Sequence, residues 1–169
     1  MRRSLMGICW VMLAGVACAL TSEADSDTHR SLPEFKLKLV DGRVVNSKDL
    51  AGKITVIDFW GTWCAPCLQE IPEYNAFYRE YKGRGVYFLA LAADSGTDKE
   101  VRDAAKKLKI EYPVAAPSWE ELDLFGNIEA FPTTMIFNAG GKLEKSFIGS
   151  SPGKQSALRE VVNRLMAGR

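Results

Sequence analysis

The sequence has little histidine, little cysteine and almost no net charge. Its 169 residues include one histidine and four cysteines, and 22 basic residues nearly balance 21 acidic ones, which gives a net charge of +1. The single histidine, His29, leaves little for a histidine-based metal site, and four cysteines are too few for a disulfide-dense scaffold. Balanced charge without a dense basic run gives no support for nucleic-acid binding. A hydrophobic share of 47% excludes global disorder.

The first residues differ in composition from the rest of the chain. Arg2 and Arg3 precede an uncharged stretch, 4–22, whose centre, 5–20, is strongly apolar. A short basic segment followed by an apolar one is typical of a secretory signal, and this stretch is also long enough to cross a bilayer as one helix. The basic residues before it favour an orientation with the N-terminus inside the cell. In each of these interpretations, the remainder of the chain is exported from the cytoplasm.

Three fates of this leader stay open. Cleavage after Ala19 would use a site with small residues at both key positions, and retention would anchor the protein in the membrane. Lipid attachment would fall on Cys18, although the residues before it match a lipid-attachment motif poorly. We therefore expect three segments: a signal peptide or membrane anchor at 1–21, a linker at 22–32 and a folded domain at 33–169.

The pattern of apolar residues predicts an α/β domain. Apolar runs at 54–60 and 86–92 are typical of buried strands, and steps of three and four from Cys67 to Tyr81 predict a helix between them. The strand–helix–strand order favours parallel pairing in the middle of a sheet and an antiparallel hairpin at its end. The other predicted elements are a strand at 35–39 with a return strand from 44, helices around 101–108 and 119–125, strands at 133–137 and 142–148, and a closing helix over 158–166.

Two cysteines, Cys64 and Cys67, remain once the leader is set aside, and they form a C-x-x-C pair. Cys64 lies where a buried strand passes into a helix, where unpaired N–H groups and the helix dipole stabilise a thiolate. We therefore expect Cys64 to attack a foreign disulfide and Cys67 to resolve the mixed disulfide. A small structural disulfide is the alternative. Zinc would need carboxylates as well, because no cysteine or histidine follows residue 67.

Two motifs carry a resemblance to a known family. The segment 58–67, DFWGTWCAPC, resembles the active-site segment of the thioredoxin superfamily, and AFPTT at 130–134 resembles its cis-proline loop. Residues 63–72 match the W-C-x-P-C-x-x-E-x-P pattern of the exported TlpA/ResA-like thiol:disulfide oxidoreductases. The resemblance covers about 33–167. It implies a thioredoxin fold, with a central mixed sheet flanked by helices, an N-terminal β-hairpin and an insertion before the cis-proline loop.

Several residues around the cysteines are candidates for the site. Asp58 interrupts a buried strand, where an unpaired carboxylate is costly, so it either handles protons or is a hydrogen-bonded structural acid. Glu70 follows Cys67 by three positions and is either a proton acceptor for that thiol or a solvated helix residue. Asp58 stands where TlpA/ResA-like proteins often have Asn. The resemblance implies substrate contacts for three further residues, Trp63, Phe131 and Pro132.

The predicted function is thiol–disulfide exchange in the periplasm or at the outer face of the cytoplasmic membrane. The resemblance implies reduction of protein disulfides, often at the haem-site cysteines of apocytochrome c during cytochrome c maturation, with electrons from a membrane thiol donor. No metal and no cofactor are expected beyond the Cys64–Cys67 disulfide, and we expect a monomer that acts on disulfide-containing or dithiol proteins. The alternatives are a disulfide-forming oxidant, a peroxide-reducing thiol protein and a non-enzymatic copper- or thiol-binding envelope module.

Overall fold

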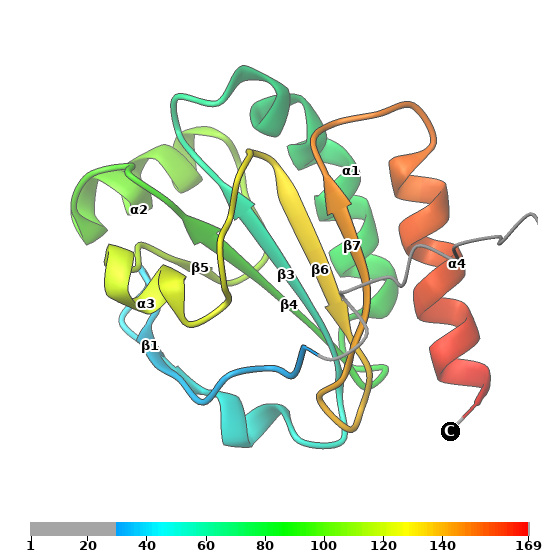
Figure 1. Cartoon of the computed structure of the whole chain (residues 1–169). Coiled ribbons are helices and arrows are strands. Elements are labelled where there is room, and N and C mark those ends of the chain that lie inside the picture. Colours follow the sequence, from blue (N-terminus) through cyan, green and yellow to red (C-terminus); the bar gives the residue numbers. More distant parts are fainter. Residues whose placement is uncertain (1–29, 169) are drawn as a thin grey trace, which may run out of the picture.

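Residues 30–168 are described by a computed structural model, in which a five-stranded sheet has helices on both faces (Figure 1). A separate two-stranded sheet precedes it. The elements are β1 (Lys36–Lys38), β2 (Val44–Asn46), the 3-10 helix η2 (Ser47–Leu50), β3 (Ile54–Trp60), α1 (Ala65–Tyr81), β4 (Val86–Ala92), α2 (Asp98–Lys107), β5 (Val114–Ala115), α3 (Trp119–Asp123), β6 (Thr133–Phe137), β7 (Leu143–Ile148) and α4 (Lys154–Ala167).

The central sheet has the strand order β5-β4-β3-β6-β7. β3 pairs in parallel with β4 and antiparallel with β6, and β6 and β7 form an antiparallel hairpin at the edge. This confirms the predicted mixed sheet, its parallel centre and its closing hairpin. The strand β5 was not predicted, because its two residues are too few to show a periodic pattern. It pairs with β4, and its Ala115 bridges to Leu39 after β1.

Two apolar clusters, one on each face of the sheet, hold the helices and the N-terminal hairpin in place. Alternate residues of β3 point to opposite faces, so Val56 and Trp60 pack against α1, α2 and α4, whereas Ile57 and Phe59 pack against α3 and the β1–β2 hairpin. The same alternation places Asp58 on the α1 face. A polar residue in the middle of β3 is thereby brought under the helix that carries the cysteines.

The expected leader, 1–21, lies outside the described residues, as does most of the expected linker. Within residues 30–168, no helix is both long and apolar enough to cross a membrane. Ser31 and Leu32 are described and already contact the domain, through a bridge to Lys142 and a hydrogen bond to Gly141. These two residues of the expected linker therefore already belong to the contacts of the domain.

Candidate functional site

The cysteine pair lies where β3 passes into α1. Cys64 is the N-cap of α1, and its Sγ accepts a hydrogen bond of 3.3 Å from the backbone N–H of Cys67. The two residues form a disulfide, with Cα atoms 5.3 Å apart, so the structure describes the oxidised state. Pro66 occupies the first turn, where its missing N–H leaves no hydrogen bond unmade. In the reduced state the same N–H would stabilise a thiolate on Cys64.

The two cysteines differ little in exposure. Cys64 is 5% exposed and Cys67 is 3% exposed, so both are buried in the disulfide form. Exposure therefore does not show which cysteine attacks the substrate and which resolves the mixed disulfide. The position of Cys64 at the helix N-terminus indicates that Cys64 attacks, because the helix N-terminus favours negative charge on its sulfur.

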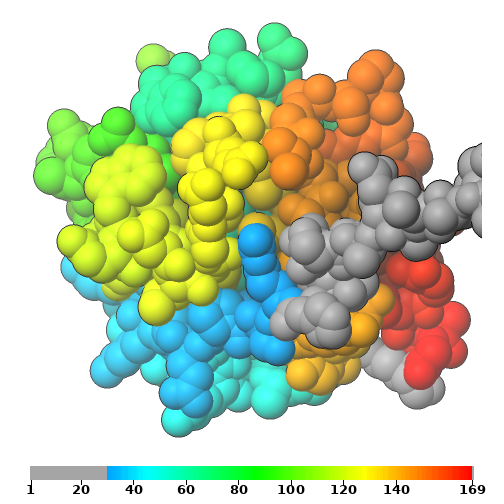
Figure 2. Space-filling model, in the orientation of Figure 1, coloured from blue at the N-terminus to red at the C-terminus, as the bar shows by residue number. Residues whose placement is uncertain are grey.

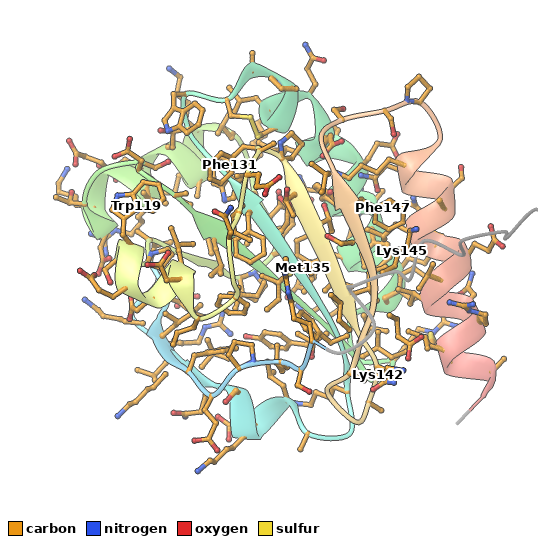
Figure 3. All side chains as sticks on the ribbon, in the orientation of Figure 1. Trp119, Phe131, Met135, Lys142, Lys145 and Phe147 are labelled. Atoms are coloured by element: carbon orange, nitrogen blue, oxygen red, sulfur yellow. A yellow bond between two sulfur atoms is a disulfide. The ribbon has the colours of Figure 1, made fainter. Side chains whose placement is uncertain are left out.

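The loop before β6 forms the other side of the site. The peptide bond between Phe131 and Pro132 is cis, as the resemblance implies. Figure 3 shows Phe131 on the segment leading into β6, at the end of the sheet where β3 passes into α1. The loop is fixed by two hydrogen bonds, from Thr133 Oγ1 to the Ala130 carbonyl at 2.7 Å and from the Gly149 N–H to the Pro132 carbonyl at 2.7 Å.

Trp63 lies over this junction and is 56% exposed. Its ring meets the ring of Phe131 edge to face, with centroids 5.5 Å apart. Its Nε1 donates to the Asp94 carbonyl at 3.0 Å, and the indole covers Gly61 so closely that a Cβ there would lie 2.7 Å from it. Trp63 and Phe131 thus form one apolar surface next to Cys64.

Asp58 is buried below the cysteines and is hydrogen-bonded. Its Oδ1 accepts from Thr134 Oγ1 at 2.9 Å, and the Tyr74 hydroxyl lies 2.7 Å from the same Oγ1. The pKa of Asp58 is raised to about 7, chiefly by burial and in part by the charge of Glu70, against the lowering effects of Lys154, Thr134 and Tyr74. Asp58 is therefore able to change its protonation state near neutral pH.

Glu70 is buried as well and does not lie on a solvated face of the helix. It is 7% exposed, and its Oε2 accepts a hydrogen bond of 2.9 Å from Lys154 Nζ. The two side chains form a buried ion pair between α1 and the start of α4. Lys154 was not singled out from the sequence, although it precedes the buried Leu158 by four residues and so falls on the buried face of α4.

The residues singled out from the sequence lie on adjoining segments, namely β3, the start of α1 and the loop before β6. Cys64, Cys67, Trp60 and Tyr74 share one apolar cluster with the partly buried Phe131. The arrangement offers a disulfide at a helix N-terminus, two buried carboxyl groups on the elements around it and an apolar surface beside it. Within residues 30–168, no group of three side chains that could hold a metal ion gathers anywhere. The chemistry that this geometry supplies is thiol–disulfide exchange.

Comparison with known proteins gives the same result. The AhpC/TSA family model matches residues 28–146. Thiol-disulfide oxidoreductase ResA of Bacillus thuringiensis subsp. konkukian is 32% identical over 145 residues, which cover 86% of this chain and 82% of the relative. ResA of Bacillus subtilis is 30% identical over 138 residues, or 80% of this chain and 74% of the relative.

A solved structure extends the likeness to three dimensions. A thiol:disulfide interchange protein of the thioredoxin family from Chlorobium tepidum superposes with a TM-score of 0.72 at 27% identity, covering 80% of this chain and 95% of that one. The predicted thioredoxin fold is thereby confirmed. The chain belongs to the AhpC/TSA family and, within it, to the ResA-like thiol-disulfide oxidoreductases.

Proposed function

We propose that this protein is an exported reductase of protein disulfides. The observation that carries the direction of electron flow is the burial of two carboxyl groups, Asp58 and Glu70, with a single lysine to offset them. Negative charge near a dithiol disfavours its thiolate and thereby its reduced form. A pair whose reduced form is disfavoured gives its electrons away more readily.

In the proposed reaction Cys64 is the nucleophile and Cys67 the resolving cysteine. The Cys64 thiolate attacks one sulfur of a substrate disulfide, which forms a mixed disulfide and releases the other substrate sulfur as a thiolate. Cys67 then gives up its proton and attacks Cys64 Sγ, the Cys64–Cys67 bond forms, and the second substrate sulfur leaves. Two electrons pass from the dithiol to the substrate. Glu70 and Asp58 are the proposed acceptors of the Cys67 proton.

The surface formed by Trp63, Phe131 and Pro132 is the proposed contact for substrate. Pro132 has no N–H, and the loop that carries it lies beside Cys64, so an extended peptide can approach along its backbone. Phe131 adds apolar area to this surface and narrows the path by which a substrate reaches Cys64. Unfolded segments are therefore expected to be better substrates than folded proteins. Peptides with a C-x-x-C disulfide, such as haem-attachment sites of apocytochrome c, have the required shape.

The proposed setting is the periplasm or the outer face of the cytoplasmic membrane, with the domain at 33–169 carried there by the leader at 1–21. Support comes from the basic and then apolar composition of that leader. No cytosolic reductase reaches this compartment, so electrons would come from a thiol donor in the membrane. The proposed working unit is a monomer with the Cys64–Cys67 disulfide as its redox group.

The thiol state of the protein in living cells tests the direction. Cells are quenched with acid and treated with an alkylating reagent that adds mass to each free thiol, and Cys64→Ser serves as the control for a protein that cannot form the disulfide. A reductase is expected to be mostly reduced at steady state. A mostly oxidised protein that passes disulfides to reduced unfolded chains would instead be a disulfide-forming oxidant.

A further inference from the structure

Lys154 is a buried charge that the stability of its own helix does not explain. It is the first residue of α4, and 1% of its side chain is exposed. Lysine is rarely buried without a partner, and in the first turn its charge faces the positive end of the helix dipole. The first turn of α4 has no acidic residue, and the N-cap, Gly153, supplies no side-chain hydrogen bond. Contacts outside α4 must account for this lysine.

Those contacts join two parts of the active site. Lys154 Nζ donates to Glu70 Oε2 at 2.9 Å and to the Gly149 carbonyl at 3.2 Å. The N–H of Gly149 donates to the Pro132 carbonyl at 2.7 Å. Figure 2 shows the corresponding surfaces in contact, the yellow segment that leads into β6 against the orange turn before α4. The lysine therefore links the helix that carries the cysteines to the loop that carries the cis-proline.

The other titratable groups around this ion pair are acids or neutral. Asp58 faces it from β3, and its pKa is lowered by the charge of Lys154 and raised by that of Glu70. Tyr74 lies on α1 with its ring centroid 5.8 Å from Lys154 Nζ. Burial raises the pKa of Tyr74 and of Tyr112 well above the usual range, so both stay neutral. Lys154 is the positive charge in this group.

We propose that Lys154 is a positioning residue for the exchange reaction, an inference that rests on the proposed roles of Glu70 and Cys67. It places a positive charge against the buried Glu70 carboxylate, and it fixes that carboxylate relative to the cis-proline loop. The charged carboxylate takes the proton from Cys67 Sγ while this sulfur attacks Cys64 Sγ. The Cys64–Cys67 bond forms, the bond between Cys64 and the substrate breaks, and the substrate leaves as a thiolate.

The test separates the two steps of the reaction with a disulfide-bridged peptide as substrate. Rapid mixing of the reduced protein with this peptide, followed by acid quenching, gives the rates of mixed-disulfide formation and of its resolution. In Lys154→Met, formation is expected to stay within about twofold, whereas resolution slows about tenfold near neutral pH. The pH profile of resolution is expected to change as well, because Lys154→Met leaves the buried Glu70 carboxyl without its positive partner.

Two variants serve as controls for charge and for general effects of substitution. Lys154→Arg keeps the positive charge and is expected to restore most of the resolution rate. Lys145→Met removes an exposed lysine of β7 and is expected to change neither step. Equal slowing of both steps in a folded Lys154→Met protein, with no shift in the pH profile, would show a structural role only and overturn the proposal.

A double variant decides whether Lys154 acts through Glu70. When Glu70→Gln has removed the carboxylate, adding Lys154→Met is expected to slow resolution by no more than about twofold, an effect left to Asp58, whose pKa the charge of Lys154 lowers. A loss of rate of about tenfold in this background, as large as that in the natural protein, would overturn the proposal. The double variant removes both charges of the ion pair and so leaves no unpaired buried charge. Its resolution rate can therefore be compared with that of Glu70→Gln even if Lys154→Met alone does not fold. The two rates can be measured in vitro whichever way electrons flow in the cell. A mostly oxidised protein in cells would therefore contradict the proposed reductase function but not the proposed role of Lys154.

Discussion

Asp58 couples the protonation of the site to the stability of the protein. Its pKa is about 7 in the folded protein because of burial, against about 3.9 in an unfolded chain. The folded state therefore binds a proton that the unfolded state has lost between these two values, and stability falls as the pH rises through this window. The loss of stability caused by the buried Asp58 charge is absent below about pH 4 and fully present above about pH 7.

Replacement of this carboxyl is accordingly expected to stabilise the protein at high pH. Asp58→Asn keeps an oxygen that can accept from Thr134 Oγ1 and removes the buried charge. We expect the free energy of unfolding of the oxidised protein to rise by about 2–4 kcal/mol near pH 8 and to change little near pH 4. Urea unfolding at the two pH values measures this. Asp103→Asn on the exposed side of α2 is the control. An equal rise in the unfolding free energy of Asp58→Asn at both pH values would contradict the expectation.

The order of the two cysteines is a second prediction for single residues. The Cys67 N–H points at Cys64 Sγ, and the helix N-terminus favours negative charge on the same sulfur. In the reduced protein Cys64 is expected to alkylate at least about tenfold faster than Cys67 near neutral pH. Mass spectrometry of the singly alkylated protein measures this ratio. Cys67→Ser should accumulate mixed disulfides and Cys64→Ser should not; the reverse result would exchange the two roles.

At the scale of elements, the loop before β6 offers substrates an apolar wall. Phe131 packs edge to face on Trp63 and contacts both core clusters. Phe131→Ala is expected to raise the KM for a disulfide-bridged peptide several-fold, because contact area is lost on one side. The rate with a small disulfide that does not reach this wall should stay the same. Val44→Ala, at a half-exposed apolar residue of the N-terminal hairpin, is the matched control. If Phe131→Ala lowered the activity with the peptide and with the small disulfide equally, the role of Phe131 would be structural.

The elements of the domain were largely predictable because their signals are local. The run that became β3 ends at Gly61 and the run that became β4 starts after Gly85, and both strands have the predicted bounds. The short elements β5 and η2 were missed, since two to four residues show no period. The N-terminal hairpin was predicted, although its strands are shorter than its apolar pattern.

The site was predictable only where a motif marked it. Cys64, Glu70 and the cis-proline loop stand in such motifs. Lys154 does not, and its partner lies 84 positions away in the sequence. Tyr74 lies at one of the helical steps between Cys67 and Tyr81, and this spacing predicts the helix without marking the hydroxyl that lies next to Thr134 Oγ1. Contacts over such separations follow from the packing of α1 and α4 on one sheet, which no local pattern specifies.

At the scale of the whole molecule, the sheet brings four connections to one end. β3 and β4 run in parallel, so the segments that follow them, with Cys64 and Asp94, lie at the same edge. β6 runs in the opposite direction, so the loop before it reaches this edge too, as does the turn after β7 (Figure 1). Hydrogen bonds tie these segments together, including one from the Thr62 N–H to Ser95 Oγ at 3.0 Å. The sheet and these hydrogen bonds thus hold the connections around the cysteine pair together.

The direction of electron flow has a consequence for the stability of the entire domain. If the buried carboxyl groups disfavour the reduced form only in the folded state, folding makes the cysteine pair more reducing than it is in the unfolded chain. A thermodynamic cycle then requires the oxidised protein to be more stable than the reduced one, by about 1.4 kcal/mol for each 30 mV of difference in potential. Urea unfolding of the two forms at the same pH measures the sign, with Cys64→Ser as a control that no reductant affects. We expect the oxidised form to unfold at the higher urea concentration, and we expect Asp58→Asn to narrow the gap. A more stable reduced form would identify an oxidant and contradict the proposed function.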